Sequence, residues 1–327
     1  MLIQHTKSFY LHMLMKHAKS FYSNIPAFDR YVENCNEDVR IFVIKYFTIR
    51  SIQSMADEKA GFGQRSQVGG LKGKMNDNKV VEIKNLVKSY GAKNFQTTVL
   101  KGIDLTIYKN DFIAIMGPSG SGKTTLLNIL STIDKPTQGM VTLDGHDVTH
   151  ISNKELAKLR KDKIGFVFQD YNLLDTMTLQ DNIALPLALD GVPAKRILEK
   201  TKELAAAFGL EAQLRQYPYQ LSGGQKQRGA VCRALITEPE IIFADEPTGA
   251  LDSKAGKDLL HCLRRVNESG QASILMVTHD PHCASYAKDV YLLSDGVMKC
   301  RISRGNDRKE FYSRIIDLQT SIGGDFA

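Results

Sequence analysis

The sequence predicts an α/β fold with a mainly parallel sheet core, an antiparallel β flank and a helical insertion. Three observations support this prediction. Apolar runs that are typical of buried strands occur at 112–116, 241–246 and 273–279, and helical segments lie between them. Alternating strand patterns precede these runs at 80–107. Helical periodicity then replaces the strand signals between about residues 171 and 236.

The first predicted elements are two strand regions, at 80–90 and 97–107, in which apolar and polar residues alternate. Such alternation is typical of antiparallel strands with one solvated face. The buried strand at 112–116 and a helix at 124–130 follow, and 139–145 is a short strand that ends in a turn. Strands that precede and then alternate with helices indicate an α/β core with a small β-rich flank.

The middle of the chain is predicted to be mainly helical. A helix at 154–163 leads into a strand at 164–169, which ends in a polar residue. Two amphipathic helices follow at 178–189 and 193–208. The second has a proline near its start and a glycine just past its end, which is typical of helix boundaries. These helices are expected to form an insertion within the α/β domain.

A loop between the strand at 112–116 and the following helix fits the phosphate-binding pattern G-x-x-x-x-G-K-[ST] without a mismatch. Its glycines allow backbone N–H groups to turn toward an anion, and Lys123 brings a positive charge to the β- and γ-phosphates. The Thr124 hydroxyl can complete the coordination shell of Mg²⁺. The alternative is a Gly/Ser-rich turn with a solvated lysine, which the strand before and the helix after disfavour. The loop consists of Gly117, Pro118, Ser119, Gly120, Ser121, Gly122, Lys123, Thr124 and Thr125.

A second glycine-containing segment, Ser222-Gly223-Gly224-Gln225, opens a predicted helix. Ser222 is a good N-cap, so one interpretation is an ordinary helix start with flexible glycines. The other interpretation is a second anion-binding helix terminus. The residues by themselves leave the two interpretations equally open.

Polar residues end three of the predicted buried strands. Asp245 and Glu246 follow an apolar strand and precede a chain reversal at Pro247, so a solvated turn is the less favoured interpretation. Asp245 can hold Mg²⁺ and Glu246 can orient a water molecule. His279 ends the next strand, and Gln169 ends the strand at 164–169. We expect all of them at one edge of a parallel sheet, beside the phosphate loop, where open α/β sheets bind ligands.

Composition limits the classes of protein to consider. The 327 residues are 43% hydrophobic, which is enough for a sizeable core, and the net charge is +7. Residues 1–74 hold 11 Lys and Arg against 6 Asp and Glu, which leaves 32 basic and 30 acidic residues from Met75 onward. The catalytic part is therefore nearly neutral, and we expect no nucleic-acid partner. The five cysteines form no C-x-x-C pair, and no segment has 18 uninterrupted apolar residues.

The segment 1–78 differs from the rest of the chain. It contains a near-repeat, at 5–10 and 17–22, and a Gly-rich run from Gly61 to Gly73. We expect a poorly structured N-terminal extension that is not native, with Met75 as the natural start. The alternatives are a genuine accessory domain and a basic tail that contacts anionic lipid.

These motifs occur together in the order and spacing of one family, and the chain resembles ATP-binding-cassette (ABC) ATPases over about residues 79–302. The motif residues are Tyr90, the loop 117–125, Gln169, the segment Ser222–Gln225, Asp245, Glu246, Asp252 and His279. The resemblance implies that Tyr90 stacks on adenine, that Gln169 contacts Mg²⁺ and senses a membrane partner, and that Glu246 is the general base. It also implies that His279 contacts the γ-phosphate, and that Ser222 and its glycines serve the nucleotide of the opposite subunit. Gly249 departs from the serine that is common before Ala250-Leu251-Asp252.

A narrower resemblance is to the exporter-associated branch, with ATPases of bacitracin-type, macrolide-export and lipoprotein-release systems. It is carried by 144–148, 165–169 and 182–187, and by 310–317, which lie in a tail at 303–327 that we expect to be helical. The resemblance implies a homodimeric ATPase that uses ATP and Mg²⁺ at the cytoplasmic face of the membrane. It would be attached there through a separate permease. The expected process is the export or detoxification of antimicrobial peptides or antibiotics.

Two other functions remain open on the sequence. A cell-division or other non-transport ABC ATPase acting on a membrane partner has the same chemistry. A nucleic-acid or ribosome-associated ABC protein is disfavoured by the single cassette and the near-neutral core.

Overall fold

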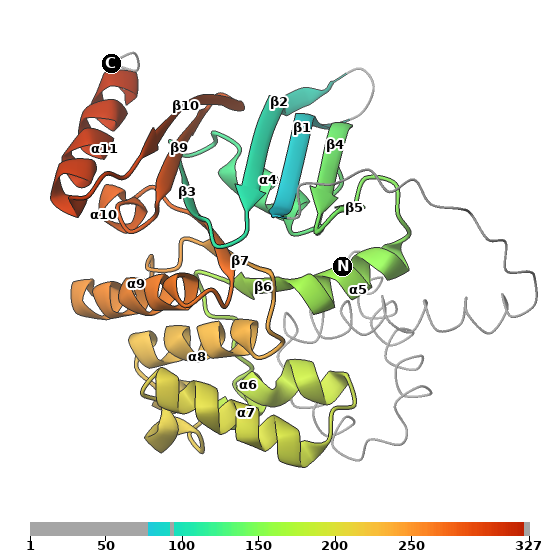
Figure 1. Ribbon diagram of the computed structural model, residues 1–327, viewed down its shortest axis with the longest axis vertical. Coiled ribbons are helices and arrows are strands. Elements are labelled where there is room, and N and C mark those ends of the chain that lie inside the picture. The colour runs from blue at the N-terminus through green and yellow to red at the C-terminus, as the bar shows by residue number, and fades with distance from the viewer. Residues whose placement is uncertain (1–77, 92–94, 324–327) are drawn as a thin grey trace, which may run out of the picture. The chain divides into compact units, whose positions relative to one another are not determined.

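A computed structural model describes residues 78–91 and 95–323, and for Ile322 and Gly323 the backbone alone (Figure 1). Residues 76–173 and 177–327 form one compact unit, whose described part is treated below. The predictions for residues 1–77, including the natural start at Met75, lie outside the described residues. Within those residues, no helix is both long and apolar enough to cross a membrane.

A six-stranded sheet forms the centre of this unit, in the order β10-β9-β3-β8-β7-β6. All neighbouring strands run parallel except β10, which pairs antiparallel with β9 at one edge. The strands are β3 (Phe112–Met116), β6 (Ile164–Val167), β7 (Ile241–Asp245), β8 (Ser273–Val277), β9 (Asp289–Ser294) and β10 (Val297–Ser303). The sequence analysis did not include β9 and β10.

A second, four-stranded sheet is antiparallel and has the order β2-β1-β4-β5. Its strands are β1 (Lys79–Tyr90), β2 (Thr97–Tyr108), β4 (Gln138–Leu143) and β5 (His146–Asp147). The register of β1 shifts between Ile83 and Leu86, where Asn85 has a positive φ of 47°. The fold class predicted from the sequence, a mainly parallel sheet with an antiparallel β flank, is confirmed.

The two faces of the central sheet pack against different layers because side chains alternate along a strand. Ile113 and Ile115 of β3 join the core that contains the antiparallel sheet and α4 (Lys123–Leu130). Phe112, Ala114 and Met116 join the core on the opposite face. Both faces of β3 are therefore covered, and all five of its residues are buried.

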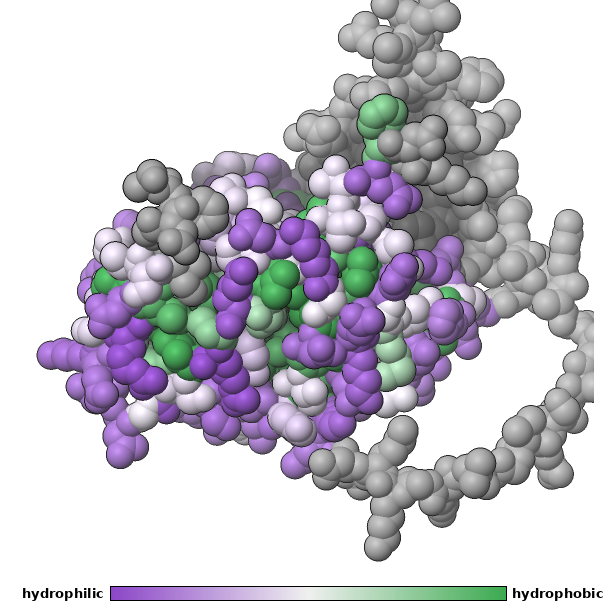
Figure 2. All heavy atoms as spheres, turned by 90° about the horizontal axis from the view of Figure 1, so that it is seen from above, coloured by the Kyte–Doolittle hydropathy of each residue, from purple (hydrophilic) through white to green (hydrophobic). Residues whose placement is uncertain are grey.

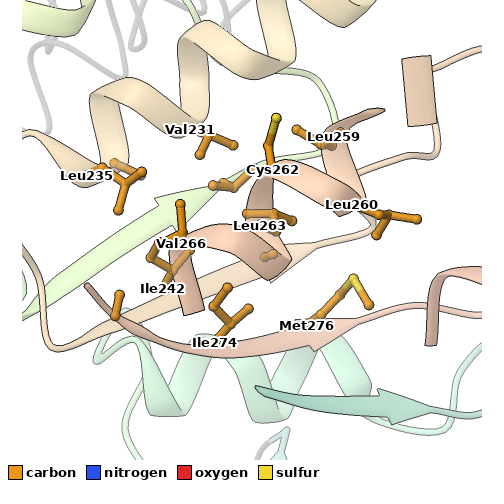
Figure 3. Close-up of a cluster of buried hydrophobic side chains, with 14 of the residues drawn as sticks. Val231, Leu235, Ile242, Leu259, Leu260, Cys262, Leu263, Val266, Ile274 and Met276 are labelled. Atoms are coloured by element: carbon orange, nitrogen blue, oxygen red, sulfur yellow. The ribbon is translucent and has the colours of Figure 1, made fainter. Parts of the chain in front are cut away.

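The opposite face is covered by α8 (Gly223–Leu235) and α9 (Ser253–Glu268). Figure 3 shows their side chains converging on those of β7 and β8. The labelled residues of this core are Val231, Leu235, Ile242, Leu259, Leu260, Cys262, Leu263, Val266, Ile274 and Met276. The helix α9, like β9 and β10, was not among the elements predicted from the sequence.

The remaining helices are α5 (Asn153–Lys163), α6 (Leu179–Leu189), α7 (Ala194–Ala207), α10 (Pro281–Ala284) and α11 (Arg308–Gly323), with short 3₁₀ turns at Glu211–Gln213 and Pro218–Gln220. In Figure 1, α6 and α7 lie beyond α8 on the side away from α9, within the range predicted as a helical insertion. The tail predicted to be helical contains α11, whose Phe311 and Ile315 are buried in the core. On the face seen in Figure 2, hydrophilic side chains surround small hydrophobic patches.

Candidate functional site

A cavity of about 730 Å³ lies at the carboxyl edge of the central sheet. In the parallel registers, Ile115 of β3 and Asp245 of β7 both pair with Val277 of β8, so these strands end side by side. The loops that follow them therefore open onto the same space. The cavity is lined by Val99, Ser119, Gly120, Gly122, Lys123, Thr124, Thr125, Asp245, Glu246, Val277 and His279.

The phosphate loop connects β3 to α4 and wraps around the Lys123 side chain. Lys123 Nζ donates hydrogen bonds to the carbonyl oxygens of Gly117 (2.8 Å) and Pro118 (2.7 Å). Gly122, the N-cap of α4, has φ 102° and a side chain there would collide with Leu100. Burial lowers the pKa of Lys123, while the nearby Glu246 and Asp245 carboxylates oppose this effect. The loop therefore presents a cation and a helix N-terminus to the cavity, which together suit an anionic ligand.

Glu246 is held in place by its backbone and by both carboxylate oxygens. It has a positive φ of 43°, and its N–H donates to the Val277 carbonyl at 2.9 Å. Oε1 accepts from the His279 N–H at 3.0 Å and lies 2.8 Å from His279 Nδ1. Oε2 accepts from the Thr278 hydroxyl at 3.2 Å. The Glu246 side chain is 16% exposed and that of His279 is 72% exposed, so the pair extends from the sheet edge to the solvent.

Asp245 lines the same cavity, and its surroundings are unfavourable for an ionised acid. Partial burial raises its pKa above the ordinary value of 3.8, the negative charge of Glu246 raises it further, and Lys123 opposes both. The ionised carboxylate is thus disfavoured by the fold. This cost is present at pH values above the folded-state pKa and disappears as the pH falls below the unfolded value.

Asp245→Asn should raise the melting temperature of the nucleotide-free protein at pH 7.5 by about 1–3 °C, the shift that up to about 1 kcal/mol produces in a domain of this size. The neutral amide removes the buried charge beside Glu246. The gain should shrink as the pH falls. Differential scanning fluorimetry checks this, with Asp258→Asn on the exposed face of α9 as the control. A melting temperature that falls or stays unchanged would contradict the assignment of Asp245 as a strained charge.

Tyr90, predicted to stack on adenine, lies at the end of β1 and does not line the cavity. Its hydroxyl donates to Asp134 Oδ2 at 2.8 Å, and the Lys88 ammonium lies 4.6 Å from the ring centroid. The ring is 43% exposed. Lys88 also forms an ion pair with Asp134, so the Tyr90 ring has a fixed position on the surface and an accessible face.

The segment Ser222–Gln225 begins α8 and also does not line the cavity. Ser222 Oγ accepts from the Gln225 N–H, and the Gln225 side chain accepts from the Ser222 N–H, which is a capping box. Asp252 caps α9 through the N–H groups of residues 254 and 255. A Cβ at Gly224 would lie 2.9 Å from that of Ala255. The second glycine therefore permits the beginnings of α8 and α9 to lie against each other.

Gln169 follows β6 and is exposed, outside the cavity lining. A Cβ at Gly249 would lie 3.2 Å from the Gln169 amide, so the glycine leaves room for this side chain. Buried Gln227 of α8 donates one hydrogen bond to the Phe168 carbonyl at 3.0 Å and another to the Pro247 carbonyl at 2.8 Å. One side chain thus connects the loops that carry Gln169 and Glu246.

Four residues of this region were not singled out in the sequence analysis: Val99, Asp134, Thr278 and Gln227. Thr278 stands one residue before His279, and its position at a strand end beside a histidine was the available signal. Asp134 contacts Tyr90, 44 residues away along the chain. Gln227 contacts Phe168, 59 residues away, and Pro247, 20 residues away. No local sequence pattern predicts contacts of this kind, because they depend on how separate elements pack.

Comparison with known proteins places the chain among ABC proteins. The ABC transporter family model matches residues 100–249. The bacitracin export ATP-binding protein BceA of Halalkalibacterium halodurans is 49% identical over 246 residues, which are 75% of this chain and 97% of that protein. The macrolide export ATP-binding/permease protein MacB of Aggregatibacter actinomycetemcomitans is 45% identical over 217 residues, or 66% of this chain and 34% of that protein.

Solved structures agree with this assignment. A dimeric, post-hydrolysis structure of the ATP-binding cassette MJ0796 bound to ADP and Pi superposes with a TM-score of 0.63 and 40% sequence identity. It covers 69% of this chain and 99% of the other. The chain therefore combines sequence similarity to ABC ATP-binding proteins, the fold of an ATP-binding cassette, and a cavity lined by a phosphate loop, two carboxylates and a histidine. The chain belongs to the ATP-binding proteins of the ABC transporter family and is an ATPase.

Proposed function

We propose that this ATPase works as a homodimer that energises a separate membrane permease for the export of antimicrobial peptides of the bacitracin type. The observation that supports the substrate class is the 49% identity with a bacitracin export ATP-binding protein over 97% of its length. A match over 246 of the 327 residues spans the segments at 144–148 and 182–187, on which the narrower resemblance rests. The protein would then act at the cytoplasmic face of a membrane, attached through its permease.

Mg²⁺ fits the residues that line the cavity. The Thr124 hydroxyl and the Asp245 carboxylate are hard oxygen ligands, and both line the same space. Burial and the neighbouring Glu246 raise the pKa of Asp245, and a bound cation would offset this cost of the ionised carboxylate. Thr124, Asp245 and the nearby Gln169 would hold the ion, which supplies positive charge to the β- and γ-phosphates.

The chain's own groups would then carry out three tasks. Lys123 and the backbone N–H groups of the phosphate loop would hold the phosphates and offset their charge. Glu246 would orient the attacking water and accept its proton on a carboxylate oxygen. His279, whose Nδ1 lies 2.8 Å from Glu246 Oε1, would keep that carboxylate in place and offer its exposed ring edge to the γ-phosphate. Tyr90 would contribute its accessible ring face to the base.

The separation of the phosphate loop from the Ser222–Gln225 segment within one chain supports a dimer. The chain carries a single phosphate loop and a single Ser222–Gln225 segment, and the second of these does not line the cavity. The ATP-binding cassette MJ0796, which has this fold, is a dimer in two solved structures. In a head-to-tail pair, the α8 N-terminus of one copy would face the phosphate loop of the other. The permease would contact the surface near 169–187, where the sheet core meets the helical insertion.

A resistance assay tests the substrate class. Cells that lack this ATPase but contain its permease should regain tolerance of bacitracin when the wild-type chain is restored. Glu246→Gln should not restore it, whereas Glu203→Gln on the exposed face of α7 should. If an active wild-type ATPase leaves bacitracin tolerance unchanged, the proposed substrate class is wrong.

A further inference from the structure

Three residues just beyond His279 gather three different metal-binding groups. Asp280, His282 and Cys283 lie on and directly before the short helix α10, which contacts α11 (Figure 1). One ligand atom from each residue lies within 4.8 Å of the other two. Cys283 Sγ donates to Asp280 Oδ2 at 3.0 Å. The carboxylate, imidazole and thiol are already close together, without any contribution from the nucleotide cavity.

We propose that Asp280, His282 and Cys283 form a binding site for one Zn²⁺ or similar divalent transition-metal ion, with water as the fourth ligand. Zinc takes this mixture of sulfur, nitrogen and oxygen ligands at about 2.0–2.3 Å, which places tetrahedral ligands roughly 3–4 Å apart. The observed separations, which are at most 4.8 Å, exceed this by up to roughly 1–2 Å. Because Asp280 Oδ2 and Cys283 Sγ already lie 3.0 Å apart, closure of the site requires mainly a rotation of the His282 ring.

The surroundings of each ligand permit such a rotation. The His282 ring contacts Tyr286 and Tyr312 edge-on, with centroids 5.5 and 6.3 Å away. Within the described residues, no hydrogen bond to its ring nitrogens is found. Asp280 uses Oδ1 to cap α10, while Oδ2 faces the Cys283 thiol. One carboxylate oxygen thus remains available for an ion without loss of the helix cap.

Two effects oppose metal binding and limit its strength. Burial raises the pKa of the Cys283 thiol to about 12, so the metal-free site keeps its proton. When the sulfur–metal bond forms, this proton leaves to the solvent. The hydrogen bond between Cys283 and Asp280 is lost at the same time. We therefore expect weaker and more reversible binding than at a structural zinc site with preformed thiolates.

The site is connected to Glu246 on two sides. The Asp280 N–H donates to Thr278 Oγ1 at 3.1 Å, and that hydroxyl donates to Glu246 Oε2 at 3.2 Å. Cys283 Sγ also lies 2.9 Å from Thr248 Oγ1, two residues after Glu246. An ion bound between Asp280 and Cys283 replaces the 3.0 Å hydrogen bond that joins them and moves their side chains apart, which alters the contacts to Thr278 and Thr248. Bound metal should therefore slow ATP hydrolysis, an effect that rests on the role proposed for Glu246.

Cobalt substitution tests the site without use of activity. In the full-length chain with Cys35→Ser, which removes the cysteine outside the described residues, added Co²⁺ should produce the sulfur-to-cobalt charge-transfer band of thiolate ligation. Cys283→Ser should abolish the band, since a hydroxyl replaces the thiol at nearly the same size. Cys300→Ser on β10 should leave it unchanged. His282→Gln should weaken the band and shift its visible partner bands.

The outcomes separate the metal site from its effect on hydrolysis. No band in the parent protein, or a band that persists in Cys283→Ser, overturns the site. If Cys283→Ser fails to fold, as judged by its melting curve, His282→Gln decides the question in its place. A band that depends on Cys283, together with turnover that Zn²⁺ slows equally in the parent and in Cys283→Ser, retains the site and overturns its connection to Glu246.

Discussion

Glu246→Gln should lower the turnover of ATP by roughly 10²–10⁴-fold, the usual range for loss of a positioned acid or base. Glutamine has nearly the same shape, and its carbonyl oxygen can still accept the hydrogen bond from the His279 N–H that Oε1 accepts now. It has no carboxylate to take a proton from water. Nucleotide binding should therefore remain, because Lys123 and the phosphate loop are unchanged.

The same substitution should prolong the life of the ATP-bound dimer, so that the dimer can be detected. If ATP is bound but hydrolysed slowly, both cavities stay filled and the two copies should stay together during size-exclusion chromatography with Mg·ATP. Glu203→Gln, an exposed change on α7, should behave as wild type in both measurements. Full activity of Glu246→Gln would mean that another residue is the base.

Lys123→Ala should weaken nucleotide binding by about 10–100-fold, which corresponds to the roughly 1.5–3 kcal/mol of a hydrogen bond to a charged group. The Lys123 ammonium is the cation that the loop presents to the cavity, and it is oriented by the carbonyl oxygens of Gly117 and Pro118. Fluorescent-nucleotide titration measures the loss. Lys109→Ala, an exposed lysine near the start of β3, is the matched control. Wild-type affinity in Lys123→Ala would remove the phosphate loop from the binding site.

Mixing two variants tests whether the site is shared between copies. Ser222→Arg should spare nucleotide binding by a monomer and block turnover, because Ser222 lies at the N-terminus of α8 and does not line its own cavity. A heterodimer of Lys123→Ala with Ser222→Arg keeps one intact pair, with the loop from one chain and the α8 N-terminus from the other. If this heterodimer never traps nucleotide while the wild-type dimer does, the shared site is wrong.

Much of the fold could be predicted because its signals are local. The buried strands β3, β7 and β8 are short apolar runs with polar residues at their ends. The phosphate loop has fixed spacing, and its strand and helix follow from the same stretch of sequence. The parallel pairing then brings Asp245, Glu246 and His279 to one edge, as the strand ends predicted.

The features that were not predicted differ in whether the sequence contains a local signal for them. The hairpin of β9 and β10 had a readable signal, since Asp295 and Gly296 both have positive φ and Asp-Gly favours a two-residue turn between strands. The hydrogen bonds of Thr278 to Glu246 and of Tyr90 to Asp134 had none. They depend on how separate elements pack, and the periodicity of one element contains no information about another.

Gln227 joins the loop after β6 to the loop after β7. Its two amide hydrogens are shared between the carbonyl oxygens of Phe168 and Pro247, and it lies on the same rigid helix that begins after Ser222. The backbones next to Gln169 and Glu246 are thus tied to each other through one side chain of α8, although the loops that carry them are more than 70 residues apart in the sequence.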